Sequence, residues 1–357
     1  MRTFTRSRRA IAVLVLAAAC TSTPSPPPSP RADGGTATST PPSSGSASGR
    51  ADAAAVLRPP PGGSFLVRGA YPPAVSRCVD AEPRSLTARY PGALSVTRSE
   101  DGTLAITVTL PFDRYLQGIA EVPPSWPAAA LEAQAIAARS YALATTGWDG
   151  QEGEPLREPI CATTACQVYR GIPVPFEPSV RRWYGAVRRT SGQVLLFDGR
   201  PADTVYFSTS NGHTYGNEDV FGSAPLPYLR PVPERDDGAS PTSRWTARIA
   251  FLDLATFLHA GGVWPAHQEI ADVRLDGESI EVSGAVSRSM ELSTFRDAVN
   301  AWAPCLAPDR FPPPSRLGSA LPVTIPSRWL HVRTTTDAVV VSGRGWGHVV
   351  GIVQWGA

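Results

Sequence analysis

The stretch EVPPSWPAAALEAQAIAARSYAL, from Glu121 to Leu143, decides the fold of this chain because it joins an acidic turn to an alanine-rich helix. Ser125 is a suitable N-cap, Pro127 fits the first helical turn, and Gly147 is a natural stop after the pattern ends. Small and aliphatic residues recur at three- and four-residue steps: Ala128, Leu131, Ala135, Ala138 and Ala142. This spacing predicts a buried helix that another element can approach closely.

Glu121 is the candidate acid of this unit, and Arg139 on the helix is its fixed cation. Apolar residues follow the acid directly: Val122, Pro123, Pro124 and Trp126. Desolvation by such neighbours raises a carboxyl pKa toward the range where the group can donate a proton. The alternative interpretation is an exposed glutamate in a turn.

The remaining chain has the alternation of an α+β protein. Asp-Gly pairs at 101–102, 198–199 and 276–277 separate strand-like runs and predict three β-hairpins. Apolar stripes predict further helices over 179–189 and 293–301. We therefore expect one α+β domain over residues 62–357, with several β-hairpins around the alanine-rich helix.

The N-terminus has the pattern of an export signal. Four arginines precede the apolar run Ala10 to Ala19, which ends in AAAC and is too short to span a bilayer. Residues 1–20 are therefore predicted to be a lipoprotein-type signal with Cys20 as the lipid anchor, although plain signal-peptidase cleavage would give a secreted protein instead. Residues 21–61 are rich in Pro, Ser and Thr and predict a disordered linker. The expected location is the outer face of the cytoplasmic membrane.

Charge excludes two classes of function. All 33 basic residues are arginine, so a lysine nucleophile or Schiff base is ruled out. Loss of the four signal arginines leaves 29 basic residues against 31 acidic ones, a net charge of about −2. A chain of this balance has no nucleic-acid signature, and we expect no nucleic-acid partner.

Four ordered blocks of the chain resemble the signature of the stage II sporulation protein D (SpoIID/LytB) family. They are YLQGI with Glu121, SWP and AARSYAL (Tyr115 to Leu143); CQVYRG (Cys166 to Gly171); YFSTSNGHT with EDVFG and PYL (Tyr206 to Leu229); and GRGWGHVVGIVQWGA (Gly343 to Ala357). The last block has Gly-His-Val at 347–349 where the family pattern has Gly-His-Gly. Four blocks in order are more specific than any one motif.

The resemblance implies lytic cleavage of the bond between N-acetylmuramic acid and N-acetylglucosamine in peptidoglycan. Glu121 would donate a proton to the glycosidic oxygen and then remove one from the C6 hydroxyl, leaving a 1,6-anhydro end. Arg139 would orient sugar oxygens, or else form a salt bridge on the helix face. The partners implied are glycan strands, the membrane through the N-terminal lipid, and other cell-wall proteins, in sporulation or division. The binding-class alternative is a glycan-binding or scaffolding module without chemistry.

Two other segments supply candidate substrate contacts. Small polar residues end a predicted strand and could form a groove wall or an ordinary turn: Ser208, Ser210, Asn211 and His213. His348 lies in a glycine-dense segment, where it could contact a ligand or serve as a structural hydrogen-bonding group.

The cysteines that follow the anchor favour disulfides over metal. Four remain, and the first choice among three possible pairings is Cys161 with Cys166 and Cys78 with Cys305. Relatives of the family can carry a histidine just before the second cysteine of the short pair, where it could hold zinc, but this chain has Ala165 there. We expect no metal and no cofactor, and the five scattered histidines do not supply the ligands of a zinc amidase.

Overall fold

The computed structural model of the chain describes residues 11–18, 55–71, 84–98, 104–119, 121–147, 159–162, 166–173, 178–312 and 323–357, with the backbone alone at 11–18, 67–71, 84–88, 104–105 and 173. The predicted anchor Cys20, the predicted disulfide residue Cys78 and most of the predicted linker lie outside the described residues. Among the described helices, none has the length and apolar character needed to cross a bilayer.

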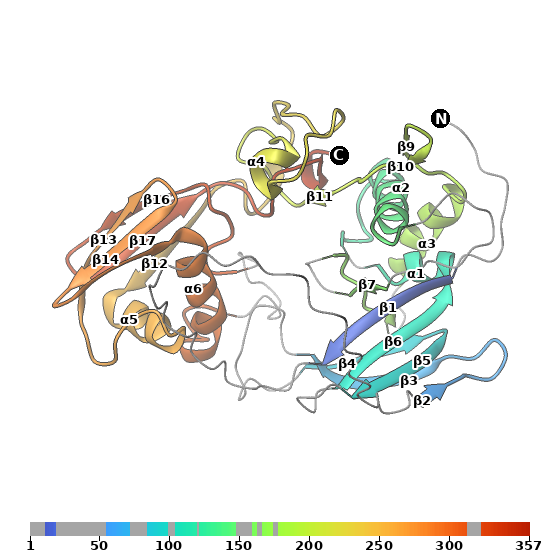
Figure 1. Cartoon of the computed structure of the whole chain (residues 1–357), viewed down its shortest axis with the longest axis horizontal. Coiled ribbons are helices and arrows are strands. Elements are labelled where there is room, and N and C mark those ends of the chain that lie inside the picture. Colours follow the sequence, from blue (N-terminus) through green and yellow to red (C-terminus); the bar gives the residue numbers. More distant parts are fainter. Residues whose placement is uncertain are drawn as a thin grey trace, which may run out of the picture.

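The described elements form two lobes, which Figure 1 shows on its right and left sides. The larger sheet of the first lobe has the order β2-β5-β6-β1-β7, with β1 Ile11–Ala18, β2 Ala55–Leu57, β5 Ala93–Arg98, β6 Leu104–Pro111 and β7 Ile160–Cys161. A second sheet has the order β3-β4-β8, with β3 Phe65–Tyr71, β4 Arg84–Tyr90 and β8 Ile172–Pro173. Two predicted segments take part in the larger sheet: the apolar run of the signal forms β1, and the end of the predicted linker forms β2.

The alanine-rich helix is confirmed as α2, Ala128–Thr145, and lies in the core of the first lobe. The N-cap is Pro127 and not Ser125 as predicted, because the turn at 123–126 closes first, with the Trp126 amide donating to the Pro123 carbonyl at 3.1 Å. Gly147 follows the C-cap with φ +70°, as a helix stop requires. Of the predicted small-residue face all but the exposed Ala128 is fully buried: Leu131, Ala135, Ala138 and Ala142. Helices α1 (Phe112–Gln117) and α3 (Val180–Arg189) pack beside it.

All three predicted hairpins are present. The strands that flank each Asp-Gly pair are antiparallel partners: β5 with β6, β9 (Leu196–Phe197) with β10 (Arg200–Pro201), and β13 (Ile270–Asp276) with β14 (Ser279–Gly284). The pair at 101–102 itself lies outside the described residues. Asp198 and Gly199 both have positive φ, at 49° and 77°, which is the conformation a two-residue hairpin turn needs.

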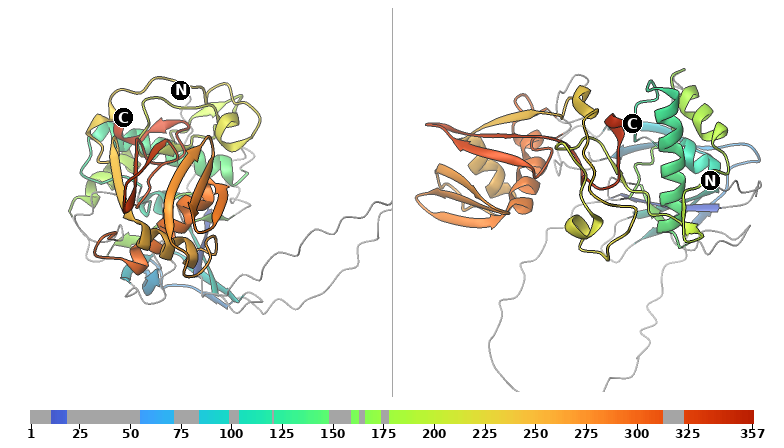
Figure 2. Two further views of the ribbon diagram at one scale, coloured as in Figure 1. Left: turned by 90° about the vertical axis from the view of Figure 1, so that its left-hand side faces the viewer. Right: turned by 90° about the horizontal axis from the view of Figure 1, so that it is seen from above.

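The second lobe has its own hydrophobic core. Its sheets have the orders β12-β17-β16 and β13-β14-β15, with β12 Trp245–Ala250, β15 Ser287–Glu291, β16 Leu330–Thr334 and β17 Ala338–Gly343. Helices α5 (Phe251–Ala260) and α6 (Leu292–Leu306) pack against them, and α6 runs five residues beyond the predicted end at Ala301. The α+β class is confirmed, with the core divided between two lobes that Figure 2 shows from two further directions.

A junction connects the lobes and contains β11 (Tyr206–Phe207), α4 (Asn217–Phe221) and β18 (Ile352–Val353). Strand β18, near the C-terminus, pairs in parallel with β11. The last residues then reach the first lobe, where the Trp355 and Trp126 rings pack edge to face at 5.1 Å. Gln354 Nε2 also donates to Gln134 Oε1 on α2 at 3.3 Å, so the glycine-rich C-terminal segment lies against both the junction and the helix α2.

Candidate active site around Glu121

Glu121 lies in the turn between α1 and α2, where a second loop is pinned against it. The Arg170 amide donates to the Gly118 carbonyl at 2.9 Å, and Ile119 forms an isolated antiparallel bridge with Tyr169. These contacts bring the loop 166–170 alongside the acid.

The Glu121 carboxyl is half-buried and accepts two hydrogen bonds. The backbone amide of Val168 donates to its Oε1 at 2.5 Å, and the hydroxyl of Tyr206 is its second partner. Burial raises the pKa of Glu121 from 4.5 to about 7, because desolvation outweighs these hydrogen bonds and the nearby Arg170 charge, which act in the opposite direction. The apolar neighbours that the sequence suggested, Val122 and Trp126, pack partly buried against the lobe core.

A buried polar network stands behind the acid. The Tyr115 hydroxyl donates to Gln167 Oε1 at 2.5 Å, and Gln167 Nε2 donates to the Ala138 carbonyl and to the Tyr206 hydroxyl oxygen, both at 3.0 Å. Because the Tyr206 oxygen accepts from Gln167, its own proton is free to point at Glu121. Burial raises the pKa of Tyr206 well above its usual value, so this hydroxyl stays protonated.

A disulfide closes the loop that carries these groups. Cys161 and Cys166 are bonded, and the bonded Cys166 directly precedes Gln167 and Val168. Cys305 is disulfide-bonded as well, and its predicted partner Cys78 lies outside the described residues. The short disulfide therefore fixes one end of the segment that binds the carboxyl.

Arg139 has a different place from the one predicted. The residue is 3% exposed, and its guanidinium donates to the carbonyls of Val187 and Gln193, at 3.2 and 3.0 Å, where helix α3 ends. Burial lowers its pKa from 12.5 to about 10, so it remains charged at neutral pH. Instead of the predicted sugar contact or salt bridge, the Arg139 guanidinium caps the C-terminal end of α3. The sequence pattern did not show this role because the partners lie about 50 residues away along the chain.

The predicted polar wall, Ser208 to His213, lies in the junction. Ser210 is 1% exposed, its amide donates to Asp237 Oδ2 at 2.6 Å, and its hydroxyl accepts from the Gly212 amide. Ser208 bonds the neighbouring Thr209 hydroxyl, so both serines hold the loop together. His213 is exposed, with its ring 4.4 Å from that of Tyr215.

Asn211 is the member of this loop that faces a pocket. It lines a cavity of about 560 Å³ at the edge of the second lobe, together with residues from β12, β16 and β17. None of the residues lining that cavity is a hydrogen-bond partner of Glu121. The structure thus divides the predicted contacts between two places.

His348 has a structural set of contacts. Its Nε2 donates to the Tyr206 carbonyl at 3.0 Å, because its Nδ1 accepts from the Val350 amide at 3.2 Å. Burial lowers the pKa of His348 from 6.5 to about 4, so the ring is neutral near pH 7. The side chain therefore positions the backbone of Tyr206, which is one step removed from the acid.

Sequence reasoning did not select the partners of Glu121. Its partner Tyr206, and Tyr115 and Gln167 of the network behind it, each lie inside one of the four quoted blocks, and membership of a block was the only signal in the sequence that could have selected them. Within the described ranges no group of three or more His, Cys, Asp or Glu side chains could hold a metal ion.

Comparison with known proteins confirms the resemblance inferred from the four blocks. Residues 100–197 match the SpoIID family, described as stage II sporulation protein. The chain is 28% identical to an uncharacterized protein of Brachyspira hyodysenteriae over 75% of this chain and 66% of that protein. It is 26% identical to the amidase enhancer of Bacillus subtilis over 66% of this chain and 36% of that protein, and 26% identical to stage II sporulation protein D of the same organism over 70% and 68%.

Proposed function

We propose that this chain is an exported peptidoglycan lytic transglycosylase with Glu121 as its acid and base. The match of residues 100–197 to the SpoIID family supports this proposal. The names of the relatives, an amidase enhancer and stage II sporulation protein D, support a setting in the cell wall. The single observation that carries the chemical part is the carboxyl of Glu121, whose pKa is raised by burial to about 7. A group with this pKa can give a proton in one step and take one in the next.

The chemistry needs only one carboxyl. Protonated Glu121 gives its proton to the glycosidic oxygen as the bond to C1 of the muramyl residue breaks. The carboxylate that remains takes the proton of the C6 hydroxyl, whose oxygen bonds to C1 and closes the 1,6-anhydro ring. No water is consumed, so the second carboxylate of a hydrolytic glycosidase is not required.

The hydrogen-bond partners of Glu121 fit this cycle. Between the two steps the carboxyl is negatively charged, and the Val168 amide and Tyr206 hydroxyl both donate to it. Donors that already point at a charge that appears during the reaction lower the free energy of that charged state, because the site does not have to reorganise. Tyr206 is thus a positioning and charge-stabilising residue in the proposed mechanism.

We also propose the cellular setting. Lipid attachment at Cys20 would hold the protein at the outer face of the cytoplasmic membrane, and the Pro- and Ser-rich segment 21–61 would let the folded part reach glycan strands above it. The cleavage would take place during sporulation or division, and the name of one relative, stage II sporulation protein D, supports the first.

The test is digestion of purified sacculi, intact and stripped of peptides, followed by mass spectrometry of the released muropeptides. We compare the parent protein with Glu121→Gln, and with Glu132→Gln as a matched control, because Glu132 lies on α2 in an exposed ion pair with Arg189. Anhydro ends from the parent and the control, and none from Glu121→Gln, are the expected result. Equal release by all three proteins assigns the chemistry to another residue, and retention on sacculi without release by any of them indicates a glycan-binding module.

A further inference from the structure

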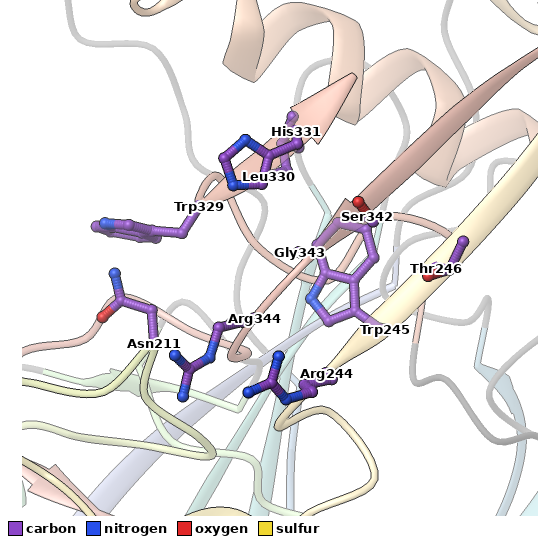
Figure 3. Close-up of a pocket in the computed structure, with 10 residues that line it drawn as sticks. All are labelled: Asn211, Arg244, Trp245, Thr246, Trp329, Leu330, His331, Ser342, Gly343 and Arg344. Atoms are coloured by element: carbon purple, nitrogen blue, oxygen red, sulfur yellow. The ribbon is translucent and has the colours of Figure 1, made fainter. Parts of the chain in front are cut away.

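The cavity lined by Asn211 is a second candidate site. It lies beside the ends of three strands of the second lobe, β12, β16 and β17. Its volume is about 560 Å³, within the range of roughly 300–1,000 Å³ typical of small-ligand pockets. Figure 3 shows the side chains that line it. Three of them determine what the cavity can bind: Arg244 and Arg344 supply positive charge, and Trp329 supplies an aromatic surface.

Sheet register explains why these three side chains meet. Gly343 is opposite Trp245 on β12 and opposite Leu330 on β16. The next row holds the three side chains: Arg244 precedes β12, Arg344 follows β17, and Trp329 precedes β16. Because these strands are neighbours in the order β12-β17-β16, the three residues lie at adjacent strand ends. The Arg344 amide donates to the Trp329 carbonyl at 3.2 Å, which keeps the last pair in register.

Arg244 and Arg344 place two like charges at neighbouring ends of strands. Within the described part of the chain neither guanidinium has an ion pair or a side-chain hydrogen bond, and no Asp or Glu lines the cavity. Like charges that face each other across adjacent strands destabilise a sheet. In Figure 3 both guanidinium groups extend toward the same part of the cavity, beside Asn211. Two guanidinium forks in this arrangement match the oxygens of a carboxylate or a phosphate.

The remaining lining suits a ring that carries hydroxyl groups. Trp329 is held in place because its Nε1 donates to the Tyr215 hydroxyl at 2.5 Å, and the Arg328 guanidinium lies 5.2 Å from the ring centre. A fixed indole offers an apolar surface to the C–H face of a sugar. Thr246 and Ser342 add hydroxyls that can bind the ring substituents.

We propose that this cavity binds an anionic saccharide, with a carboxylate or phosphate on Arg244 and Arg344 and the sugar ring against Trp329. The site differs in lining from the one at Glu121 and does not depend on the chemistry there. It would let the protein recognise a charged wall glycan on the second lobe.

The test is calorimetric titration of the full-length protein with four probes: N-acetylglucosamine, N-acetylglucosamine 6-phosphate, glucuronic acid and inorganic phosphate. The same titrations are run on Arg244→Gln, Arg344→Gln and Trp329→Ala. Arg333→Gln is the matched control, since Arg333 is an exposed arginine on β16 outside the cavity lining. Glu121→Gln separates this site from the proposed catalytic one.

We expect a charged sugar to bind at least about tenfold more tightly than the neutral one, with a loss of about tenfold or more in each arginine variant. Preference for the phosphate or the carboxylate probe identifies the source of the anion. Unchanged binding in Arg333→Gln and Glu121→Gln completes the expected pattern. Equal affinity for neutral and charged sugars, or arginine variants that bind like the parent, would overturn the proposal. So would inorganic phosphate binding as tightly as the sugar phosphate, because the ring would then contribute nothing.

Discussion

Replacing Glu121 by glutamine should change how the stability of the folded chain depends on pH, independently of any reaction. Burial raises the pKa of this carboxyl from 4.5 to about 7. Below pH 4.5 the group is protonated in both the folded and the unfolded chain and has no effect. Between pH 4.5 and 7 the folded chain holds a proton that the unfolded chain has lost, so the free energy of unfolding falls as the pH rises.

The size of the effect follows from the same pKa. At ~1.4 kcal/mol per pKa unit, the rise corresponds to about 3 kcal/mol of stability lost by pH 8. Because Glu121 is partly exposed, solvent screening reduces this to about 2 kcal/mol. Glutamine has no charge to desolvate, so the stability of Glu121→Gln relative to the parent should rise by that amount between pH 4 and pH 8.

The assay is urea unfolding followed by tryptophan fluorescence at pH 4, 6 and 8. Exposed Glu269 supplies the control variant Glu269→Gln, for which the difference from the parent should stay constant. A constant difference for Glu121→Gln as well would mean that its carboxyl is not desolvated. The proposed acid and base role would then lose its physical basis.

Substitutions at three further residues test the surroundings of the site. Arg139→Met should lower the stability by about 2 kcal/mol, because it removes the donor to buried carbonyls at the end of α3. The pH profile of cleavage should stay unchanged, and a shifted profile would mean that Arg139 acts on the catalytic site. Opening the Cys161–Cys166 disulfide by Cys166→Ser should move the pH profile upward, because the amide that favours ionised Glu121 is less well held, and an unmoved profile would deny the disulfide this role. Val349 is buried and has a left-handed backbone at φ 59°. In thermal unfolding, Val349→Gly should lower the stability by less than about 1 kcal/mol, because relief of the backbone strain offsets the lost packing, whereas Val349→Ala should lower it by about 2 kcal/mol. The reverse order would show that the backbone at this position is not strained.

Local features of the sequence were sufficient to predict the three hairpins and the helix α2, but not the strands β1 and β2. An Asp-Gly pair between alternating runs specifies a hairpin within a few residues, and all three such pairs do so here. The period of small residues likewise specified α2. The start of that helix was misplaced because Ser125 precedes a Pro-bounded turn, whose own hydrogen bond decides where helical geometry begins.

Long-range contacts account for what sequence reasoning missed in the site. The acidity of Glu121 could be expected from its apolar neighbours, but its donors come from Val168 and Tyr206, far along the chain. The same holds for Arg139, whose partners lie at the end of α3. A side chain on a helix of small residues has no local sign of what approaches it, so its partners depend on tertiary packing.

The glycine-rich C-terminal segment is best explained as a support for Tyr206, and its composition follows from that task. Ile352 pairs with Tyr206 in the parallel β11–β18 ladder, and His348 donates to the Tyr206 carbonyl. This approach is so close that a Cβ on Gly351 would lie 2.2 Å from the Val205 carbonyl oxygen. Gly351 also has φ +78°, so both the spacing and the backbone angle require glycine there. Gly351→Ala should therefore displace the strand that carries Tyr206 and weaken the hydrogen bond between Tyr206 and Glu121.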